Sequence, residues 1–155
     1  MRLCEQSKLL WAVAPANYTG AAATAKYVSL KNYGHATIAI QTGAWAGGAA
    51  AVTVEQATDV SGTGTKTLSF TSYWHDETTS GTLAEATCSD TFDLDTANKL
   101  YVIEIDAADL DVANAFDCLS VQIATPGANN DYYSVAYVLS QPRFGSATPP
   151  SALVD

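Results

Sequence analysis

The segment KLYVIEID, residues 99–106, decides the fold class of this chain of 155 residues. Tyr101, Ile103 and Ile105 recur at every second position of the segment. Successive side chains of a β-strand point to opposite faces, so a period of two puts these three on one face. The segment therefore predicts a strand with one buried face, and it is the strongest such signal in the chain.

The same period of two recurs on both sides of this segment. Ile38 and Ile40 alternate in HATIAIQ (35–41), and Val52 and Val54 alternate in AAVTVEQAT (50–58). This is the pattern of an antiparallel sheet with one solvated face. The other runs of this kind are KYVSL (26–30), KTLSFTSYW (66–74), TCSDTFDL (87–94), DCLSVQIA (117–124) and YYSVAYVLS (132–140). In KTLSFTSYW we expect Leu68, Phe70 and Trp74 to point inward.

These runs amount to about eight or nine strands, spaced by roughly 8–14 residues. The segment AADLDVANAF (107–116) has a weak helical pattern, long enough for a turn or two. The segment HDETTSGTLAEA (75–86) is polar and predicts a loop. Many short strands without a convincing helix are typical of a sandwich or a barrel. We therefore predict an all-β fold: an antiparallel two-sheet β-sandwich, jelly-roll-like, with an extended N-terminal arm and C-terminal tail.

The periodic runs also place the domain boundaries. Residues 1–25 lack a sustained period apart from a short strand predicted near residues 9–13, so we interpret them as an N-terminal arm. Residues 26–140 are the sandwich domain. The tail QPRFGSATPPSALVD (141–155) contains three prolines and no hydrophobic period. Proline lacks an N–H donor and fixes its own φ, so the tail is predicted to be extended.

Composition and charge argue against several classes of protein. With 48% hydrophobic and 15% charged residues, the chain is not intrinsically disordered. Its net charge of −9 opposes contact with phosphates, so no nucleic acid is expected as a partner. No run approaches the ~20 apolar residues of a membrane span, so no membrane partner is expected either.

The cysteines and the N-terminal residues indicate the cellular compartment. Cys4, Cys88 and Cys118 are odd in number and widely spaced, which indicates neither a disulfide framework nor a zinc site. The uninterrupted apolar run Leu9–Ala14 is shorter than the central region of a signal peptide. We therefore expect synthesis and folding in the cytoplasm.

The sharpest candidate for a chemical site is YWHDE (73–77), because imidazole and carboxylates can hold zinc or manganese. His75 and Asp76 are adjacent, however, and adjacent residues on a strand point to opposite faces. The segment is better interpreted as a strand end that runs into a solvated loop. The other histidine, His35, lies beside Gly34 in a turn, and no G-x-S-x-G context supports a catalytic triad. We expect no catalytic residues and no enzymatic activity.

Two groups of carboxylates have the alternate spacing that calcium sites often use. Neither has the spacing of an EF-hand loop, so solvated loop acids are the favoured interpretation. They are Asp90, Asp93 and Asp95, and Asp106, Asp109 and Asp111. We expect no metal and no cofactor.

The three tryptophans raise the possibility of an aromatic binding surface, as in carbohydrate-binding sandwiches. Trp74 continues an inward period and is interpreted as core. Trp45, in GAWAGG, lies among small residues in a predicted loop. A large aromatic side chain there is either tucked over a sheet edge or used as an anchor in a partner's pocket, and both alternatives stay open.

Two stretches resemble small structural proteins encoded in the head-gene clusters of tailed phages. They are IAIQTGAWAGGAAAVTVEQATDVSGTGTKTLSF (38–70) and LYVIEIDAADLDVANAFDCLSVQIATPGANNDYYSVAYVLSQPRFGSATPPSALVD (100–155). The resemblance covers residues 31–155 and implies a capsid decoration (cement) protein. Such a protein is a β-sandwich that binds the outside of the head and bridges neighbouring capsomers. It would be made in the host cytoplasm and would end on the capsid exterior of the virion.

The resemblance implies the major capsid protein as a partner, and symmetry favours a homotrimer or homodimer. A proline-rich tail is already extended, so it would lose less conformational entropy when it clamps a neighbour. We therefore expect the tail to carry most of the partner contacts, with Arg143, Phe144 and Leu153 as anchors. The full set of partner-binding candidates is Trp11, Trp45, Pro142, Arg143, Phe144, Pro149, Pro150 and Leu153.

The alternative function is a receptor-binding or carbohydrate-binding sandwich of a phage tail or fibre. Exposed coplanar aromatics with polar neighbours would favour sugar binding. A flat face rich in threonine and alanine, together with ordered termini, would favour assembly.

Overall fold

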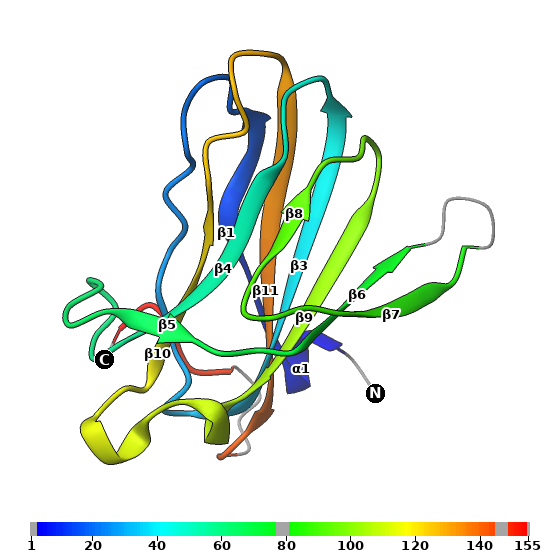
Figure 1. Cartoon of the computed structure of the whole chain (residues 1–155). Coiled ribbons are helices and arrows are strands. Elements are labelled where there is room, and N and C mark those ends of the chain that lie inside the picture. Colours follow the sequence, from blue (N-terminus) through cyan, green and yellow to red (C-terminus); the bar gives the residue numbers. More distant parts are fainter. Residues whose placement is uncertain (1–2, 77–80, 145–148, 155) are drawn as a thin grey trace.

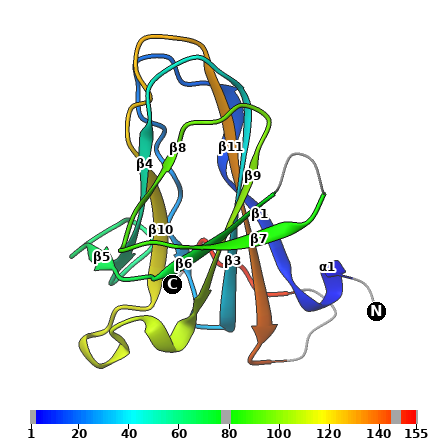
Figure 2. The same ribbon diagram turned by 45° about the vertical axis from the view of Figure 1, so that its right-hand side comes forward.

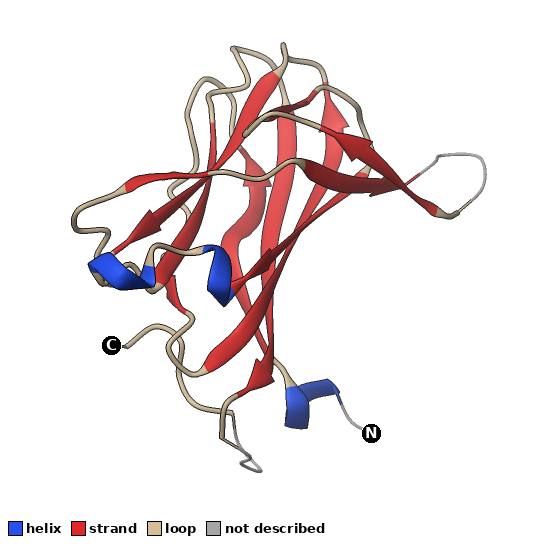
Figure 3. Cartoon of the chain, turned by 60° about the horizontal axis from the view of Figure 1, so that its bottom comes forward, coloured by secondary structure: helices blue, strands red, loops and turns tan. Residues whose placement is uncertain are grey.

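The computed structural model describes residues 3–76, 81–144 and 149–154. Within these ranges the chain folds into two antiparallel β-sheets that pack face to face (Figure 1), which confirms the predicted all-β sandwich. The helical segments, blue in Figure 3, are α1 (Leu3–Gln6), η1 (Ala107–Asp109) and η2 (Val112–Asn114). The last two are the turns predicted for residues 107–116. No helix in the described part of the chain has the length and apolar character needed to cross a membrane.

The larger sheet has six strands in the order β1-β11-β3-β9-β6-β7. Their bounds are β1 (Lys8–Asn17), β3 (Tyr33–Trp45), β6 (Ser72–Asp76), β7 (Leu83–Thr87), β9 (Leu100–Asp106) and β11 (Asp131–Pro142). Figure 2 shows the two sheets edge on, with the β6–β7 pair running across the other strands and past the side of the sandwich.

The smaller sheet has five strands, with β2, β10, β4 and β5 in that order and β8 paired with β4. Their bounds are β2 (Val28–Ser29), β4 (Ala50–Ala57), β5 (Lys66–Leu68), β8 (Phe92–Leu94) and β10 (Cys118–Ile123). β5 pairs with the second half of β4 and β8 with its first half, so the two short strands follow one another along one edge.

The connectivity is that of a jelly roll. Taken in chain order, its eight strands are β2, β3, β4, β6, β7, β8, β9 and β10. The first, eighth, third and sixth of these form one sheet, and the second, seventh, fourth and fifth form the other. This interleaving of two Greek keys defines the jelly roll. β11 and β1 extend the larger sheet on the far side of β3.

The inward side chains of both sheets form a single hydrophobic core. In β9, Tyr101, Ile103 and Ile105 are at most 2% exposed, as their period of two predicts. Burial of each such side chain stabilises the fold by about 1.5–3 kcal/mol. Other core residues from the predicted runs are Ile38, Ile40, Val52, Val54, Leu119, Val121, Ile123, Val135 and Leu139.

The segment KTLSFTSYW departs from its prediction because it crosses between the sheets. Leu68 and Phe70 are buried as expected, but strand pairing stops after Leu68 and resumes in the other sheet at Ser72. The alternation shifts by one residue at this crossing. Tyr73 therefore packs against the core, whereas Trp74 points outward and is 37% exposed. The prediction that Trp74 belongs to the core is wrong.

The predictions for the two segments that follow, residues 75–86 and 87–94, also need correction. The predicted loop 75–86 contains the end of β6 and most of β7, an edge strand whose inward residues are the small Ala84 and Ala86, so it carries almost no hydrophobic signal. In the predicted strand 87–94, Thr87 ends β7 and Phe92–Leu94 form β8, which pairs in the smaller sheet.

The N-terminal residues contribute a full strand to the larger sheet. β1 is ten residues long and pairs with β11 along its length, which makes the predicted short strand at residues 9–13 an underestimate. The register shifts between Trp11 and Val13, and the bulge buries both Ala12 and Val13. Two consecutive buried residues break the period of two, and this is why the strand is hard to see in the sequence.

Candidate partner-binding face

The outward face of the six-stranded sheet carries the most conspicuous surface feature of the molecule. The register places Trp11 of β1 opposite Ala136, Ala136 opposite Ala39, Ala39 opposite Val102, and Val102 opposite Trp74 of β6. Residues directly opposite in antiparallel strands point to the same face. These five side chains therefore lie in one row across five strands, and we name it the tryptophan row.

The tryptophan row is an apolar strip with an exposed aromatic side chain at each end, while Ala39 and Ala136 are half-buried and Val102 is 9% exposed. Trp11 is 52% and Trp74 is 37% exposed. Four inter-strand spacings of about 4.8 Å separate them, or roughly 19 Å along the sheet. The three residues between them have shorter side chains, so the surface of the strip lies closer to the sheet backbone in its middle than at its two ends. Leu9, 46% exposed and opposite Val138, adds apolar surface in the next row.

Carboxylates border the Trp74 end of the tryptophan row. Glu85 lies opposite Trp74 on the edge strand β7, and Glu104 and Asp106 continue the outward face of β9 beyond Val102. Asp76 shares the outward face of β6, and one of its oxygens accepts a hydrogen bond from the backbone of Leu100 at 2.8 Å. We call these four residues, Asp76, Glu85, Glu104 and Asp106, the acidic rim.

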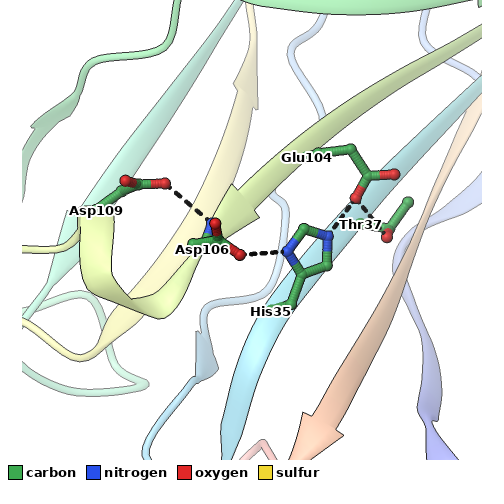
Figure 4. Close-up of polar contacts among 5 residues, drawn as sticks. All are labelled: His35, Thr37, Glu104, Asp106 and Asp109. Carbon is green, nitrogen blue, oxygen red and sulfur yellow. Dashed lines mark hydrogen bonds and ion pairs between the residues drawn. The ribbon is translucent and has the colours of Figure 1, made fainter.

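His35 is held between two carboxylates of the rim (Figure 4). Its Nδ1 lies 2.7 Å from Asp106 Oδ1, and its Nε2 contacts Glu104 Oε2. Thr37 donates a hydrogen bond to the same Glu104 oxygen at 2.7 Å. Burial lowers the pKa of His35, but the hydrogen bonds and charges of Asp106 and Glu104 outweigh it, so its pKa is raised. Because both ring nitrogens of His35 face carboxylates, His35 holds the Glu104 and Asp106 side chains in place. Neither of its nitrogens is left open to act as a base.

The candidate metal ligands of YWHDE do not converge. On β6, His75 has its ring centroid 5.9 Å from the inward-facing Tyr73, while Asp76 points outward. Glu77 lies outside the described residues. Within the described ranges, His, Cys, Asp and Glu side chains form no group of three or more that could hold a metal ion.

Trp45 occupies the tucked position of its two alternatives. It ends β3, its indole Nε1 donates to the backbone oxygen of Gly48 at 3.2 Å, and its ring centroid lies 6.2 Å from that of Tyr133. Trp45 thus packs against the core at one end of the sandwich. Its role in partner binding stays a prediction.

The first part of the tail continues the larger sheet. Pro142 is the last residue of β11 and pairs with Tyr33, and the backbone N–H of Arg143 donates to Asn32 at 2.9 Å. Phe144 follows with 70% of its surface exposed.

The end of the tail lies on its own domain. The Tyr33 hydroxyl donates to the backbone oxygen of Pro150, and Ser29 of β2 donates to the backbone oxygen of Ala152 at 2.8 Å. Ala152 is 1% exposed and belongs to the core. Leu153 is 43% exposed and lines a surface hollow of about 330 Å³. Residues 149–154 therefore cover the edge of the smaller sheet, and binding of the tail to a partner stays a prediction.

Sequence reasoning identified Trp11 and missed the rest of the row. Ala39, Val102 and Ala136 are unremarkable in the sequence, and only the strand register brings them between two tryptophans. The size of Trp74 and its polar neighbours in the sequence were compatible with a surface binding residue. The change of sheet before Ser72 turned its side chain outward, opposite to the inward direction that the alternation predicted.

Comparisons with known proteins add one structural similarity. No family model and no curated protein matches the chain. Among solved structures, the crystal structure of the SPBc2 prophage-derived protein YomS is similar, with a TM-score of 0.49 and 12% sequence identity. The match covers 86% of this chain and 93% of that one. Function therefore has to be inferred from the residues of this chain.

Proposed function

We propose that this chain is a structural virion protein of a tailed phage, which decorates the outer surface of the capsid and bridges neighbouring capsomers. The observation that carries the proposal is the tryptophan row, an apolar strip across the open face of the larger sheet with an exposed tryptophan at each end. Apolar surface bordered by polar residues is typical of interaction sites. The resemblance of residues 31–155 to phage head proteins directs the choice of partner to the major capsid protein.

The shape of the face favours a protein partner over a small ligand. Tryptophans are frequent anchors of protein interfaces, because each buries a large rigid surface at little entropic cost. Ala39 and Ala136 let a partner surface approach the sheet between these anchors. The hollow beside the row, lined by Gln41, Tyr132 and Ser134 among others, holds about 230 Å³. This is below the ~300–1,000 Å³ of ordinary ligand pockets.

The proposal extends to the tail and to self-association. Phe144 and Leu153 remain exposed although the tail is attached to its own domain, so they are available as secondary contacts. Bridging of capsomers is most simply achieved by a homodimer or homotrimer on a symmetry axis of the capsid.

The test is co-sedimentation of the purified protein with undecorated heads of the phage that encodes it. Saturable binding at a fixed number of copies per capsomer is the expected result. A well-folded protein that stays in the supernatant at every concentration would overturn the proposal. Light scattering during size-exclusion chromatography of the free protein measures its oligomeric state in the same preparation.

A carbohydrate-binding role is the second candidate, favoured by one observation. Trp11 and Trp74 are exposed on the same face and have polar neighbours, as in sugar-binding platforms. The residues between them have no rings on which sugars could stack, which argues for separate stacking sites. A glycan screen in which single Trp11→Ala and Trp74→Ala variants each lose binding to the same glycan would favour this role.

A further inference from the structure

We infer that the surface bound by the tryptophan row presents an apolar centre with lysine and arginine side chains along the side that faces the acidic rim, and that it is not a second copy of this chain. The inference rests on the proposed function and specifies the chemistry of the capsid surface at the contact. It follows from the charges around the row.

The charge on the outward face of the larger sheet has one sign. The outward positions of its six described strands include the four carboxylates of the acidic rim and no lysine or arginine. Glu85 is exposed, and the Glu104 and Asp106 side chains are 42% and 63% exposed. His35, when charged, compensates one of these carboxylates at most.

The described basic residues occupy other positions. Lys8 begins β1 opposite the buried Leu139, and Lys26 lines the hollow beside Leu153. Lys66 pairs with Asp111 and lies 4.2 Å above the ring of Phe116, and Lys99 lies 5.3 Å from the ring of Tyr101. Lys31 and Arg143 line a separate hollow beside η2. None of these described lysine and arginine side chains lies at an outward position of the larger sheet.

The single sign of the rim decides between the possible occupants. If two copies docked with their rows running in the same direction, their acidic rims would approach each other, and like charges across an interface oppose binding. If the rows ran in opposite directions, each rim would meet the Trp11 end of the other copy, whose outward positions carry no lysine or arginine to complement it. A partner with arginine and lysine beside an apolar centre would instead gain complementary contacts along the rim. Such contacts accelerate encounter and fix orientation, while the two tryptophans contribute most of the affinity.

The experiment measures binding to undecorated heads with matched charge variants. Glu85→Lys reverses one rim charge at an exposed strand position, and Asp93→Lys makes the same change at the exposed middle position of β8 in the smaller sheet. We expect Glu85→Lys to weaken binding about fivefold or more, and Asp93→Lys to leave it unchanged. Wild-type binding should also weaken between about 0.1 and 1 M salt, as the Debye length falls from about 10 to about 3 Å.

The possible failures are distinguishable. If wild-type protein binds heads but Glu85→Lys binds as tightly and salt has no effect, the basic partner surface is ruled out while the proposed function stands. If wild-type protein is an oligomer that Trp74→Ala converts to a monomer, a second copy occupies the row and the inference is overturned. If wild-type protein does not bind heads at all, the proposed function fails and the inference fails with it.

Discussion

The hydroxyl of Tyr137 accepts a hydrogen bond from the backbone N–H of Val121 at 2.9 Å, across the core and between the two sheets. β2 is two residues long and pairs with β10 only at Cys118 and Leu119. Val121 lies further along β10, past the end of this pairing, and its backbone N–H finds its acceptor in the Tyr137 hydroxyl instead. Both residues are fully buried. Burial raises the pKa of Tyr137 to about 12, so its hydroxyl stays protonated well above neutral pH.

Tyr137→Phe should destabilise the fold although it keeps the ring. The buried Val121 N–H would lose its partner, at a cost of about 1–3 kcal/mol. Chemical denaturation of the variant measures this loss. Tyr132→Phe is the matched control, because Tyr132 is 45% exposed and should change stability by less than about 0.5 kcal/mol. Equal stability of both variants would show that the inter-sheet hydrogen bond contributes nothing.

Gly47 and Gly48 should respond differently to alanine. Asp131, fully buried, accepts hydrogen bonds from the backbones of Ala46 and Gly47 at 2.9 and 2.7 Å. A Cβ at Gly47 would collide with Asp131 Oδ2 and with the Pro126 backbone, whereas at Gly48 the nearest atom is 3.9 Å away.

We therefore expect Gly47→Ala to lose roughly 1–3 kcal/mol of stability, as overpacked sites do. Gly48→Ala should be close to neutral. Thermal unfolding of the pair checks this, and a neutral Gly47→Ala would mean that the loop can move away from Asp131.

Ala152→Leu tests whether the end of the tail packs on its own domain. Ala152 is 1% exposed, so the three added carbon atoms of leucine have no space and should cost about 1–3 kcal/mol. Val154→Leu, at a position 66% exposed, is the control and should be tolerated. If both variants unfold at the wild-type temperature, residues 149–154 do not lie on the sheet edge in solution.

His35 should make stability depend on pH. Its pKa is raised in the folded protein above the ordinary value of 6.5. A raised histidine pKa stabilises the fold fully below the unfolded-state value, and this contribution is lost as pH rises through the folded-state pKa. The free energy of unfolding of wild-type protein should therefore decline from about pH 6.5 upward.

Denaturation series across this range, on wild-type protein and two variants, measure the effect. His35→Ala should flatten the decline, because Glu104 and Asp106 lose their shared partner. His75→Ala leaves the His35 contacts intact and should keep it. A decline that persists in His35→Ala would assign the pH dependence to other groups.

The fold could be predicted from the sequence because its strongest strands have one fully buried face. For Ile38 and Ile40, as for Ile103 and Ile105, the alternation alone predicts correctly that the side chain points into the core. Edge strands with small inward residues, such as Ala84 and Ala86, carry no comparable signal.

The candidate site was harder to predict because it depends on long-range register. Trp11 and Trp74 are 63 positions apart in the sequence and lie on one face only through the pairing of β1, β11, β3, β9 and β6. The direction of Trp74 also depends on where the chain changes sheets, which local periodicity does not report.

The most direct test of the account is head binding by a Trp11→Ala/Trp74→Ala variant. Loss of two anchor residues should weaken attachment by at least about thirtyfold, the effect of a single strong hot spot. Val112→Ala, which removes an apolar side chain 57% exposed in η2, is the control. We expect the double variant to fold, as its melting temperature will show, and to stay in the supernatant. We expect Val112→Ala to sediment with the heads. A folded double variant that sediments like wild-type protein would contradict the account.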